Sequence, residues 1–412
     1  MMNAPELTSH FPLAQPVQTE TATQEIPEAP TVLFVDQSGQ LGGAEFSLLP
    51  LASACTARGK VVLLSEGPFR GRLEALGVRV QVINEARVSG INRDAMQLNW
   101  LRALPGIWRQ VRAIAEQAKQ FDVLFLNTQK ALVLGALGKP LHRKRVIWHL
   151  HDIMSREHFG HVQLFIVKWL VRHAVDHVVA NSRASANSLI ALTGLSADAV
   201  PVVHNGIDAS EFSRIDASDM AMLRRRLGLP EKAWLAGLFG RLAPWKGQHI
   251  ALAALARMPD VHLVLVGAAL FGEDAYAQSL HRQAEQLGIE DRVHFAGFRD
   301  DMPTWMKAMD VILHTSTEPE PFGRVIIEGM AAAKPVVAAA AGGVTEILRH
   351  RKNGWLVKPG DVAGFVDAVE TLRAAPEFAQ RLADQAFIDA QHDFSLDGYL
   401  KQMTLAIAHT AR

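Results

Sequence analysis

A chain of 412 residues exceeds what one hydrophobic core usually serves, so we expect two domains. Hydrophobic residues make up 49% of the chain and charged residues 20%, as in an ordinary globular α/β protein. The 42 Lys and Arg balance 42 Asp and Glu, which excludes the strong positive field of a nucleic-acid-binding protein. A single cysteine, Cys55, excludes an intrachain disulfide and fits a reducing compartment.

The N-terminal residues 1–30 mix Pro, Glu, Thr and Gln without apolar periodicity, and we interpret them as a disordered tail. They lack the basic start and the continuous apolar run of a secretory signal. No later apolar run is long enough to span a bilayer. We therefore expect a cytoplasmic protein. Peripheral contact of residues 159–175 with the inner face of the membrane stays open, and core packing is the favoured alternative.

Short β-branched runs alternate with longer amphipathic segments from residue 31 onward, which is typical of βαβ units around a mostly parallel sheet. A polar stretch over residues 205–224 interrupts this rhythm. The strand candidates before it are residues 32–35, 61–64, 78–83, 123–126, 146–150 and 177–180, and those after it are residues 233–239, 261–266, 293–295, 311–313 and 336–339.

The two rhythms predict an α/β fold of two doubly wound, Rossmann-like domains, over residues 31–205 and 206–390. A helical pattern near the C-terminus has no strand after it, so residues 391–412 are expected to cross back to the first domain. Ligands of open parallel sheets lie beyond the carboxyl ends of the strands. In two stacked domains those ends can face each other across a cleft.

A glycine-rich segment, Gly-Gln-Leu-Gly-Gly-Ala-Glu at residues 39–45, follows the first strand directly. Gly42 and Gly43 let the backbone approach a ligand closely, and the next helix offers free N–H groups to an anion. The segment is not the dinucleotide fingerprint G-x-G-x-x-G, and the acidic residue that accompanies that fingerprint is missing. A plain tight turn explains the segment about as well.

The loop Gly-Arg-Leu-Ala-Pro-Trp-Lys-Gly at residues 240–247 carries two cations after the strand that ends at Phe239. Arg241 can grip two phosphate oxygens with its forked guanidinium, while Lys246 supplies a point charge. Together they suit a diphosphate. The alternative is a solvated loop with two ordinary surface cations.

The segment Glu-Pro-Phe-Gly-Arg-Val-Ile-Ile-Glu at residues 320–328 gives the strongest signal. Pro321 favours the start of a helix, and Gly323 lets the backbone approach a ligand. Glu328 lies about two turns further on, among apolar residues. If this carboxylate is buried it needs hydrogen-bond donors, which the hydroxyls of a ribose would supply. The alternative is a Glu328 that faces solvent.

Two histidines stand at the end of a first-half strand in Trp-His-Leu-His-Asp, residues 148–152. His149 and His151 point to the same side of a strand, so we expect one of them to face the cleft. A metal pair is disfavoured because no convincing third ligand accompanies it. A neutral core histidine is the other alternative for either residue.

Taken together, these motifs resemble the retaining glycosyltransferases of the GT-B fold in glycosyltransferase family 4, or glycosyl transferases group 1. The resemblance runs from about Val32 to Asp361, and two positions depart from it, since His204 and Thr345 stand where the family often has Pro. The motifs occur in the family's order: Gly42-Gly-Ala-Glu45, His151-Asp152, Val203-His-Asn-Gly-Ile-Asp208, Gly240-Arg-Leu with Lys246-Gly247, Glu320-Pro-Phe-Gly with Glu328, Gly342-Gly-Val-Thr-Glu346, and Asn353-Gly-Trp-Leu-Val357 with Pro359-Gly-Asp361.

For the second domain the resemblance implies a site for the donor, a nucleotide-sugar. Arg241 and Lys246 would hold its diphosphate and stabilise the charge that develops as the glycosidic bond breaks. Glu320 would hold sugar hydroxyls, and Glu328 would bind the ribose. The other donor-binding positions that it implies are Gly240, Phe322, Gly323 and Arg324.

For the first domain the resemblance implies the acceptor side. His151 would reach the transferred sugar from across the cleft, and Gly42 and Gly43 would allow close approach of the phosphate or the acceptor. Members of the family generally need no metal because the two cations replace it. No cofactor is therefore expected, since the nucleotide-sugar is a substrate.

We therefore predict a retaining, metal-independent hexosyl- or related glycosyltransferase. It would pass a sugar from a nucleoside-diphosphate sugar to a glycan, lipid-linked or small-molecule acceptor, in cell-envelope or exopolysaccharide biosynthesis. The alternatives are a catalytically silent sugar-nucleotide-binding protein and a GT-B epimerase or phosphorylase. UDP, GDP and ADP sugars all stay open as donors, as does the oligomeric state, and no nucleic-acid partner is expected.

Overall fold

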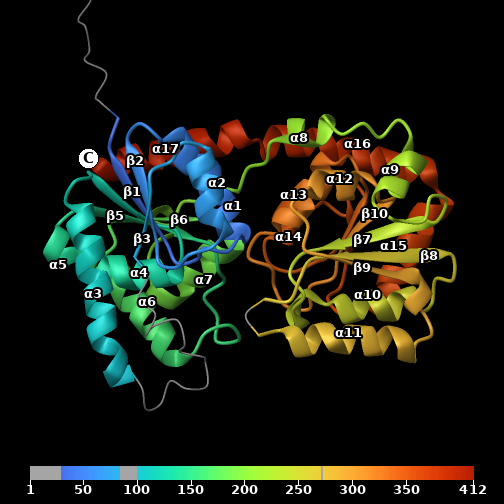
Figure 1. Ribbon diagram of the computed structural model, residues 1–412, viewed down its shortest axis with the longest axis horizontal. Helices are drawn as coiled ribbons and strands as arrows, with labels where there is room; N and C mark the ends of the chain where they lie inside the picture. The colour runs from blue at the N-terminus through green and yellow to red at the C-terminus, as the bar shows by residue number, and fades with distance from the viewer. Residues whose placement is uncertain (1–28, 84–99, 271) are drawn as a thin grey trace, which may run out of the picture.

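The computed structural model of the protein describes residues 29–83, 100–270 and 272–412, with the side chains of residues 100–103 left aside. The predicted disordered tail lies outside these residues except for its last two. Two six-stranded sheets, each built from consecutive strands of one half of the chain, lie side by side (Figure 1). The predicted α/β architecture is confirmed. Across the described residues, no helix combines the length and the apolarity needed to cross a bilayer.

The first sheet has the strand order β3-β2-β1-β4-β5-β6, and every neighbouring pair is parallel. This is the doubly wound order of Rossmann-like domains. Its β-branched and aromatic runs are buried on both faces, as a parallel sheet between helix layers requires. The strands are β1 (Val32–Asp36), β2 (Gly59–Leu63), β3 (Val80–Val82), β4 (Val123–Leu126), β5 (Arg145–Leu150) and β6 (His177–Ala180).

Helices cover both faces of the first sheet. One face packs against α3 (Trp100–Ala118), α4 (Gln129–Leu137), α6 (His161–His173) and α7 (Arg183–Thr193), with the short α5 (Lys139–His142) beside α3. The other face packs against α1 (Gly43–Ala54), α2 (Pro68–Ala75) and α17 (Leu396–Ala411).

The second sheet repeats this topology with the order β12-β11-β10-β7-β8-β9, again all parallel. The sequence prediction found five of these strands and missed β12, a three-residue strand at the sheet edge. The strands are β7 (Trp234–Phe239), β8 (Val261–Val266), β9 (Val293–Gly297), β10 (Val311–His314), β11 (Val336–Ala339) and β12 (Trp355–Val357).

Helices also sandwich the second sheet. One face carries α8 (Ala209–Ser213), α9 (Met220–Arg226), α12 (Met302–Lys307), α13 (Arg324–Ala331), α14 (Val344–Ile347) and α16 (Pro376–Asp393). The other carries α10 (Gln248–Leu255), α11 (Asp274–Gln286) and α15 (Val362–Ala374). Three 3₁₀ turns complete the described elements: η2 (Ala197–Ala199), η3 (Pro244–Lys246) and η4 (Glu290–Arg292).

The C-terminal helix α17 leaves the second half and packs on the first, which confirms the predicted crossing (Figure 1). Tyr399, Met403 and Ile407 are buried in the first-half core, and the Tyr399 hydroxyl donates to the Ser47 carbonyl at 3.0 Å. The two segments that join the halves are hydrogen-bonded to each other, since the amide of Ile207 donates to the Phe394 carbonyl at 2.8 Å. The two crossings therefore form one joint.

The joint is too tight for a side chain at Gly206. A Cβ there would lie 2.7 Å from Tyr399 Cβ and 2.8 Å from Leu396 Cα. We expect Gly206→Ala to destabilise the protein by about 1–3 kcal/mol through overpacking, which differential scanning calorimetry measures as a lower melting temperature. Gly71→Ala is the matched control, because a Cβ at Gly71 meets no atom within 4 Å. Equal melting temperatures for the two variants would contradict this account.

Candidate active site

A cleft of about 2100 Å³ lies between the two halves. Its lining includes loops that follow β1, β4 and β5 of the first sheet and β7, β8, β9 and β10 of the second, together with parts of α1, α13 and α17. The volume exceeds that of an ordinary small-ligand pocket and leaves room for two substrates. Ten of the predicted site residues line it: Gly42, Gly43, His151, Gly240, Arg241, Lys246, Glu320, Gly323, Arg324 and Glu328.

Phe322 is the exception among the predicted residues. Its side chain is buried and packs against the rings of His204 and Phe394, at centroid distances of 5.7 and 6.1 Å. Phe322 therefore anchors the segment in the core of the second half, while its neighbours Pro321 and Gly323 line the cleft.

Lys246 and Glu320 form the central ion pair of the second-half wall. Lys246 Nζ lies 2.9 and 2.7 Å from the two carboxylate oxygens of Glu320, although the residues are 74 positions apart. Lys246 ends η3, and Gly247 after it has φ +71°. A Cβ at Gly247 would lie 2.0 Å from the Thr315 carbonyl oxygen, so only glycine permits this close approach.

Glu320 is also held by the end of β10. Its Oε2 lies 3.1 Å from His314 Nε2 and accepts from the Ser316 hydroxyl at 3.1 Å. Burial alone would raise the pKa of this carboxyl, but the Lys246 charge and the His314 contact hold the pKa far below its ordinary value. Glu320 is therefore a fixed anion that positions the ammonium group of Lys246.

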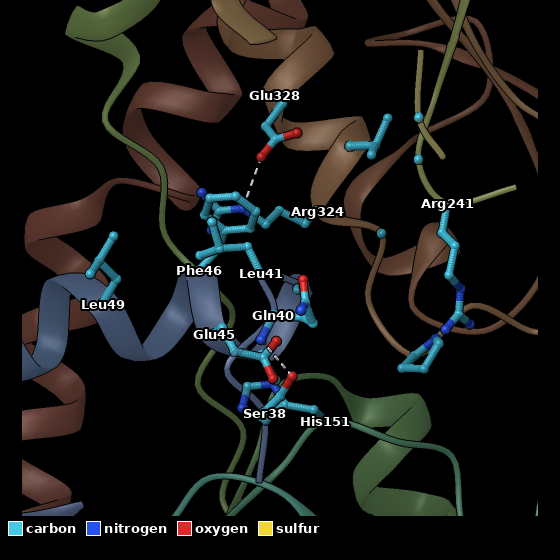
Figure 2. Close-up of a pocket in the computed structure, with 18 of the residues that line it drawn as sticks. Ser38, Gln40, Leu41, Glu45, Phe46, Leu49, His151, Arg241, Arg324 and Glu328 are labelled. Atoms are coloured by element: carbon cyan, nitrogen blue, oxygen red, sulfur yellow. Dashed lines mark hydrogen bonds and ion pairs between the residues drawn. The ribbon is translucent and has the colours of Figure 1, made fainter. Parts of the chain in front are cut away.

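Arg241 follows β7 and extends into the same cleft (Figure 2). Together, Arg241 and Lys246 bring two cations to one wall, beside Gly240, whose φ is +130°. Such a pair can bind two adjacent phosphates and stabilise negative charge that develops on them.

Glu328 projects from α13 and pairs with Arg324 one turn earlier, at 2.8 Å between Oε1 and Nε (Figure 2). Burial raises the pKa of Glu328 above its ordinary value despite the opposing Arg324 charge. The solvent-facing alternative is wrong, because only 14% of this side chain is exposed. The Arg324 guanidinium also lies 5.3 Å from the centre of the Phe46 ring on α1, across the cleft.

The helix start predicted at Pro321 is wrong. Helix α13 begins at Arg324, and Gly323 caps it with φ +103°, a backbone conformation that favours glycine. Pro321 instead belongs to the turn that carries Glu320 against the Gly342–Gly343 loop, where the Gly343 amide donates to the Glu320 carbonyl at 2.8 Å.

The opposite wall contains a polar network that the sequence analysis did not identify. Asn127 Nδ2 donates to Asp36 Oδ2 at 2.6 Å, and Asn127 Oδ1 lies 3.1 Å from His151 Nε2. The Asp36 carboxyl is also hydrogen-bonded to that of Glu45, which closes the glycine-rich segment. The positions of these residues could have indicated the network, because Asp36, Asn127 and His151 stand at or just after the carboxyl ends of adjacent strands.

The Asp36 and Glu45 carboxyls are buried and in contact, so they share a proton. Burial raises the pKa of Glu45 to about 8, with a further contribution from the Asp36 charge, and burial raises the pKa of Asp36 as well. Burial also lowers the pKa of His151 to about 3, so its imidazole is neutral. On the first-half wall His151 is therefore neutral and the Asp36–Glu45 pair keeps one proton, while Arg241 and Lys246 line the second-half wall.

The two histidines of β5 have different places. His149 is fully buried, and its ring centre lies 3.9 Å from that of His151. His151 is the one that lines the cleft. Within the described part of the chain, no group of three or more His, Cys, Asp and Glu side chains could hold a metal ion.

The two departures from the family pattern make hydrogen bonds where a proline ring could not. His204 Nε2 lies 3.0 Å from Glu346 Oε2, and Thr345 Oγ1 donates to the Gly342 carbonyl at 3.0 Å. Glu346 also accepts the backbone amides of Arg183 and Ala184, both at 2.8 Å, at the start of α7 in the first half. Glu346 is thus a contact between the halves.

The fold and this cleft agree with comparisons against known families. The model described as Glycosyltransferase Family 4 matches residues 41–211, and the one described as Glycosyl transferases group 1 matches residues 219–388. The chain therefore belongs to the family 4 (group 1) glycosyltransferases of the GT-B fold.

Particular relatives are similar over different lengths. HepE of Anabaena, solved in complex with UDP and glucose, is 38% identical with a TM-score of 0.84, covering 92% of this chain and 99% of HepE. The lipopolysaccharide core biosynthesis glycosyltransferase LpsE of Rhizobium meliloti is 36% identical over 44% of this chain and 53% of LpsE. A D-inositol 3-phosphate glycosyltransferase of Xylanimonas cellulosilytica is 36% identical over 51% of each chain. The chain thus spans about half the length of these curated relatives.

The shared proton makes stability depend on pH. Folding raises the Glu45 pKa from 4.5 to about 8, so the stabilisation is complete below pH 4.5 and is lost as the pH rises through about 8. Glu45→Gln keeps a donor and cannot ionise. We expect its melting temperature, measured by scanning fluorimetry between about pH 6 and pH 9, to fall less with pH than that of the wild type.

The control for this measurement is Glu285→Gln, at an exposed position of α11. It should retain the pH dependence of the wild type. A Glu45→Gln profile parallel to that of the wild type would rule out a shared proton in the first-half wall.

Proposed function

We propose that the protein is a retaining, metal-independent hexosyltransferase that uses a UDP-sugar. The observation that carries the proposal is the cleft itself, in which Arg241 and Lys246 line one wall and the neutral imidazole of His151 lines the other. Two fixed cations suit the charge that a departing diphosphate develops. In this proposal the two cations stabilise the departing diphosphate in place of a divalent metal, and no cofactor takes part.

The donor is proposed from one relative together with the geometry. HepE has been solved with UDP and glucose and with UDP-glucose, and its similarity covers nearly the whole of this chain. In this chain Glu328 would accept from the ribose hydroxyls, and the Glu320 segment would bind the hexose beside Lys246.

In the proposed reaction the bond between the sugar C1 and the diphosphate oxygen breaks as a C1–O bond to the acceptor hydroxyl forms. The acceptor attacks the face that the leaving group departs, and its proton leaves with the nucleoside diphosphate. His151 would contact the transferred sugar from the first half. The name of LpsE supports a carbohydrate acceptor of the cell envelope.

Nucleotide binding gives a direct test of the donor. UDP at about 100 times its dissociation constant should stabilise the fold by about 2.7 kcal/mol, and scanning fluorimetry would detect this as a higher melting temperature. GDP and ADP at the same concentration are the matched comparison. A larger stabilisation by either of them would overturn the choice of UDP.

Substitution of the two cations tests their role in transfer. Arg241→Ala and Lys246→Ala should each lower turnover by roughly 10²–10³, because their contacts strengthen as charge develops on the leaving group. Turnover is measured as UDP release from UDP-glucose that depends on added acceptor. Transfer requires such dependence, whereas an epimerase or a silent binding protein would not have it.

The controls are Arg257→Ala and Lys352→Ala, which remove exposed cations of the second half. Both should keep wild-type turnover. Because Lys246→Ala leaves Glu320 without its ion pair, the melting temperature is measured for each variant alongside turnover. Unchanged turnover in both Arg241→Ala and Lys246→Ala would refute the assignment.

A further inference from the structure

The proposed donor leaves one end of the cleft for a second substrate. Glu328 lies at one end of the cleft and His151 lies apart from it at the other, with Arg241 to one side (Figure 2). A donor with its ribose at Glu328 and its diphosphate at the two cations brings its sugar to His151. The acceptor hydroxyl that attacks this sugar therefore enters from the His151 side.

Residues of both halves meet beyond the strand end that carries His151. The loop after it reaches His158, whose Nδ1 lies 3.3 Å from Glu318 Oε2 in the second half. The amide of the preceding Thr317 donates to the Trp245 carbonyl at 2.8 Å. We call this region the Trp245 end of the cleft, and its lining residues are Asp152, Ile153, Glu157, His158, Trp245 and Glu318.

Trp245 presents an aromatic ring to this part of the cleft. The residue is only partly buried, and the Lys246 ammonium lies 4.1 Å from the ring centre. The Thr317 hydroxyl also donates to the Trp245 carbonyl, at 3.3 Å. These contacts hold the indole in place before a ligand arrives, which lowers the entropic cost of binding. Such a ring suits the C–H face of a sugar, because it combines a flat apolar body with a polar edge.

The Asp152 carboxylate lies in the same region without hydrogen-bond donors of its own. Within the described part of the chain it accepts no hydrogen bond, although the residue is partly buried. Burial raises the pKa of this carboxyl, and His158 opposes the rise. A carboxylate that is shielded from water needs donors. The hydroxyl groups of a ligand would supply them.

The charges of the Trp245 end favour a neutral ligand. Three of its six residues, Asp152, Glu157 and Glu318, are acids, and none of the six is Lys or Arg. Carboxylates accept hydrogen bonds from hydroxyl groups, whereas they repel a phosphate. This end of the cleft therefore differs from the wall of Arg241 and Lys246, which suits an anion.

We propose, as an extension of the proposed transfer reaction, that the Trp245 end binds the acceptor as a neutral pyranose ring. One face of the ring would pack on the indole of Trp245, and its hydroxyls would donate to Asp152. The ring would thereby present a further hydroxyl to the donor sugar at His151. An open-chain polyol lacks the flat face, and a phosphorylated sugar meets the three carboxylates.

Saturation-transfer difference NMR on the full chain, with saturating UDP, tests the proposal. The probes are methyl glycosides of glucose, galactose and mannose, with sorbitol as the open-chain control and glucose 6-phosphate as the charged control. At least one methyl glycoside should bind, with its strongest signals on the C–H protons of one ring face. Sorbitol and glucose 6-phosphate should each bind about tenfold more weakly.

Substitutions identify the two contacts. Trp245→Ala should weaken binding of the glycoside by about tenfold, whereas Trp245→Phe keeps a ring and should retain most of the affinity. Asp152→Asn should also weaken it by about tenfold, because a neutral amide oxygen replaces a charged acceptor. The matched controls are Trp169→Ala and Asp198→Asn, at exposed positions away from the lining of the cleft. Both should bind like the wild type.

The melting temperature is measured with and without UDP for every variant, and a wild-type rise shows an intact donor site. The proposal is overturned if no methyl glycoside binds the wild type although UDP stabilises it, or if Trp245→Ala binds the glycoside undiminished. Equal binding of sorbitol or glucose 6-phosphate would overturn it as well. A wild type that UDP fails to stabilise would refute the proposed donor, and this acceptor site with it.

Discussion

The ion pair between Lys246 and Glu320 organises the second-half wall of the cleft. The two residues are distant in sequence but meet because β7 and β10 are adjacent in the sheet and their loops leave it at the same edge. Glu320 is fixed by His314 and Ser316, so Lys246 is held in one place. Preorganised charge of this kind needs no rearrangement when a charged ligand reacts.

The two walls of the cleft are electrostatically unlike, and this difference follows from burial. On the second half, Lys246 and Glu320 neutralise each other, and this ion pair holds the pKa of Glu320 below its ordinary value. On the first half, Asp36 and Glu45 have no such cation in their hydrogen-bond network and instead retain a proton. A charged donor and a neutral hydroxyl acceptor would each meet the wall that suits them.

Most of the fold could be predicted from the sequence, because parallel strands buried on both faces are continuous β-branched runs. Strand β12 was missed because its three residues lie between Asn353-Gly354 and Pro359-Gly360, whereas the equally short β3 lies within a longer β-branched run, residues 78–83. The start of α13 was predicted too early, at Pro321, because the chain first turns at Gly323, whose φ is positive. The motif residues of the cleft were found from spacing and resemblance. The contact between Asp36 and Glu45 was not, because it depends on how the intervening loop folds back.

Glu346 constrains how the two halves can move. Its carboxylate accepts two backbone amides at the start of α7, so parting α14 from α7 would strip both amides of their acceptor. Across the cleft, the Arg324 guanidinium lies over the Phe46 ring of α1, and this cation–aromatic contact is weaker than the hydrogen bonds of Glu346. Glu346 thus ties α14 of the second half to the start of α7 in the first, in addition to the joint at Ile207 and Phe394.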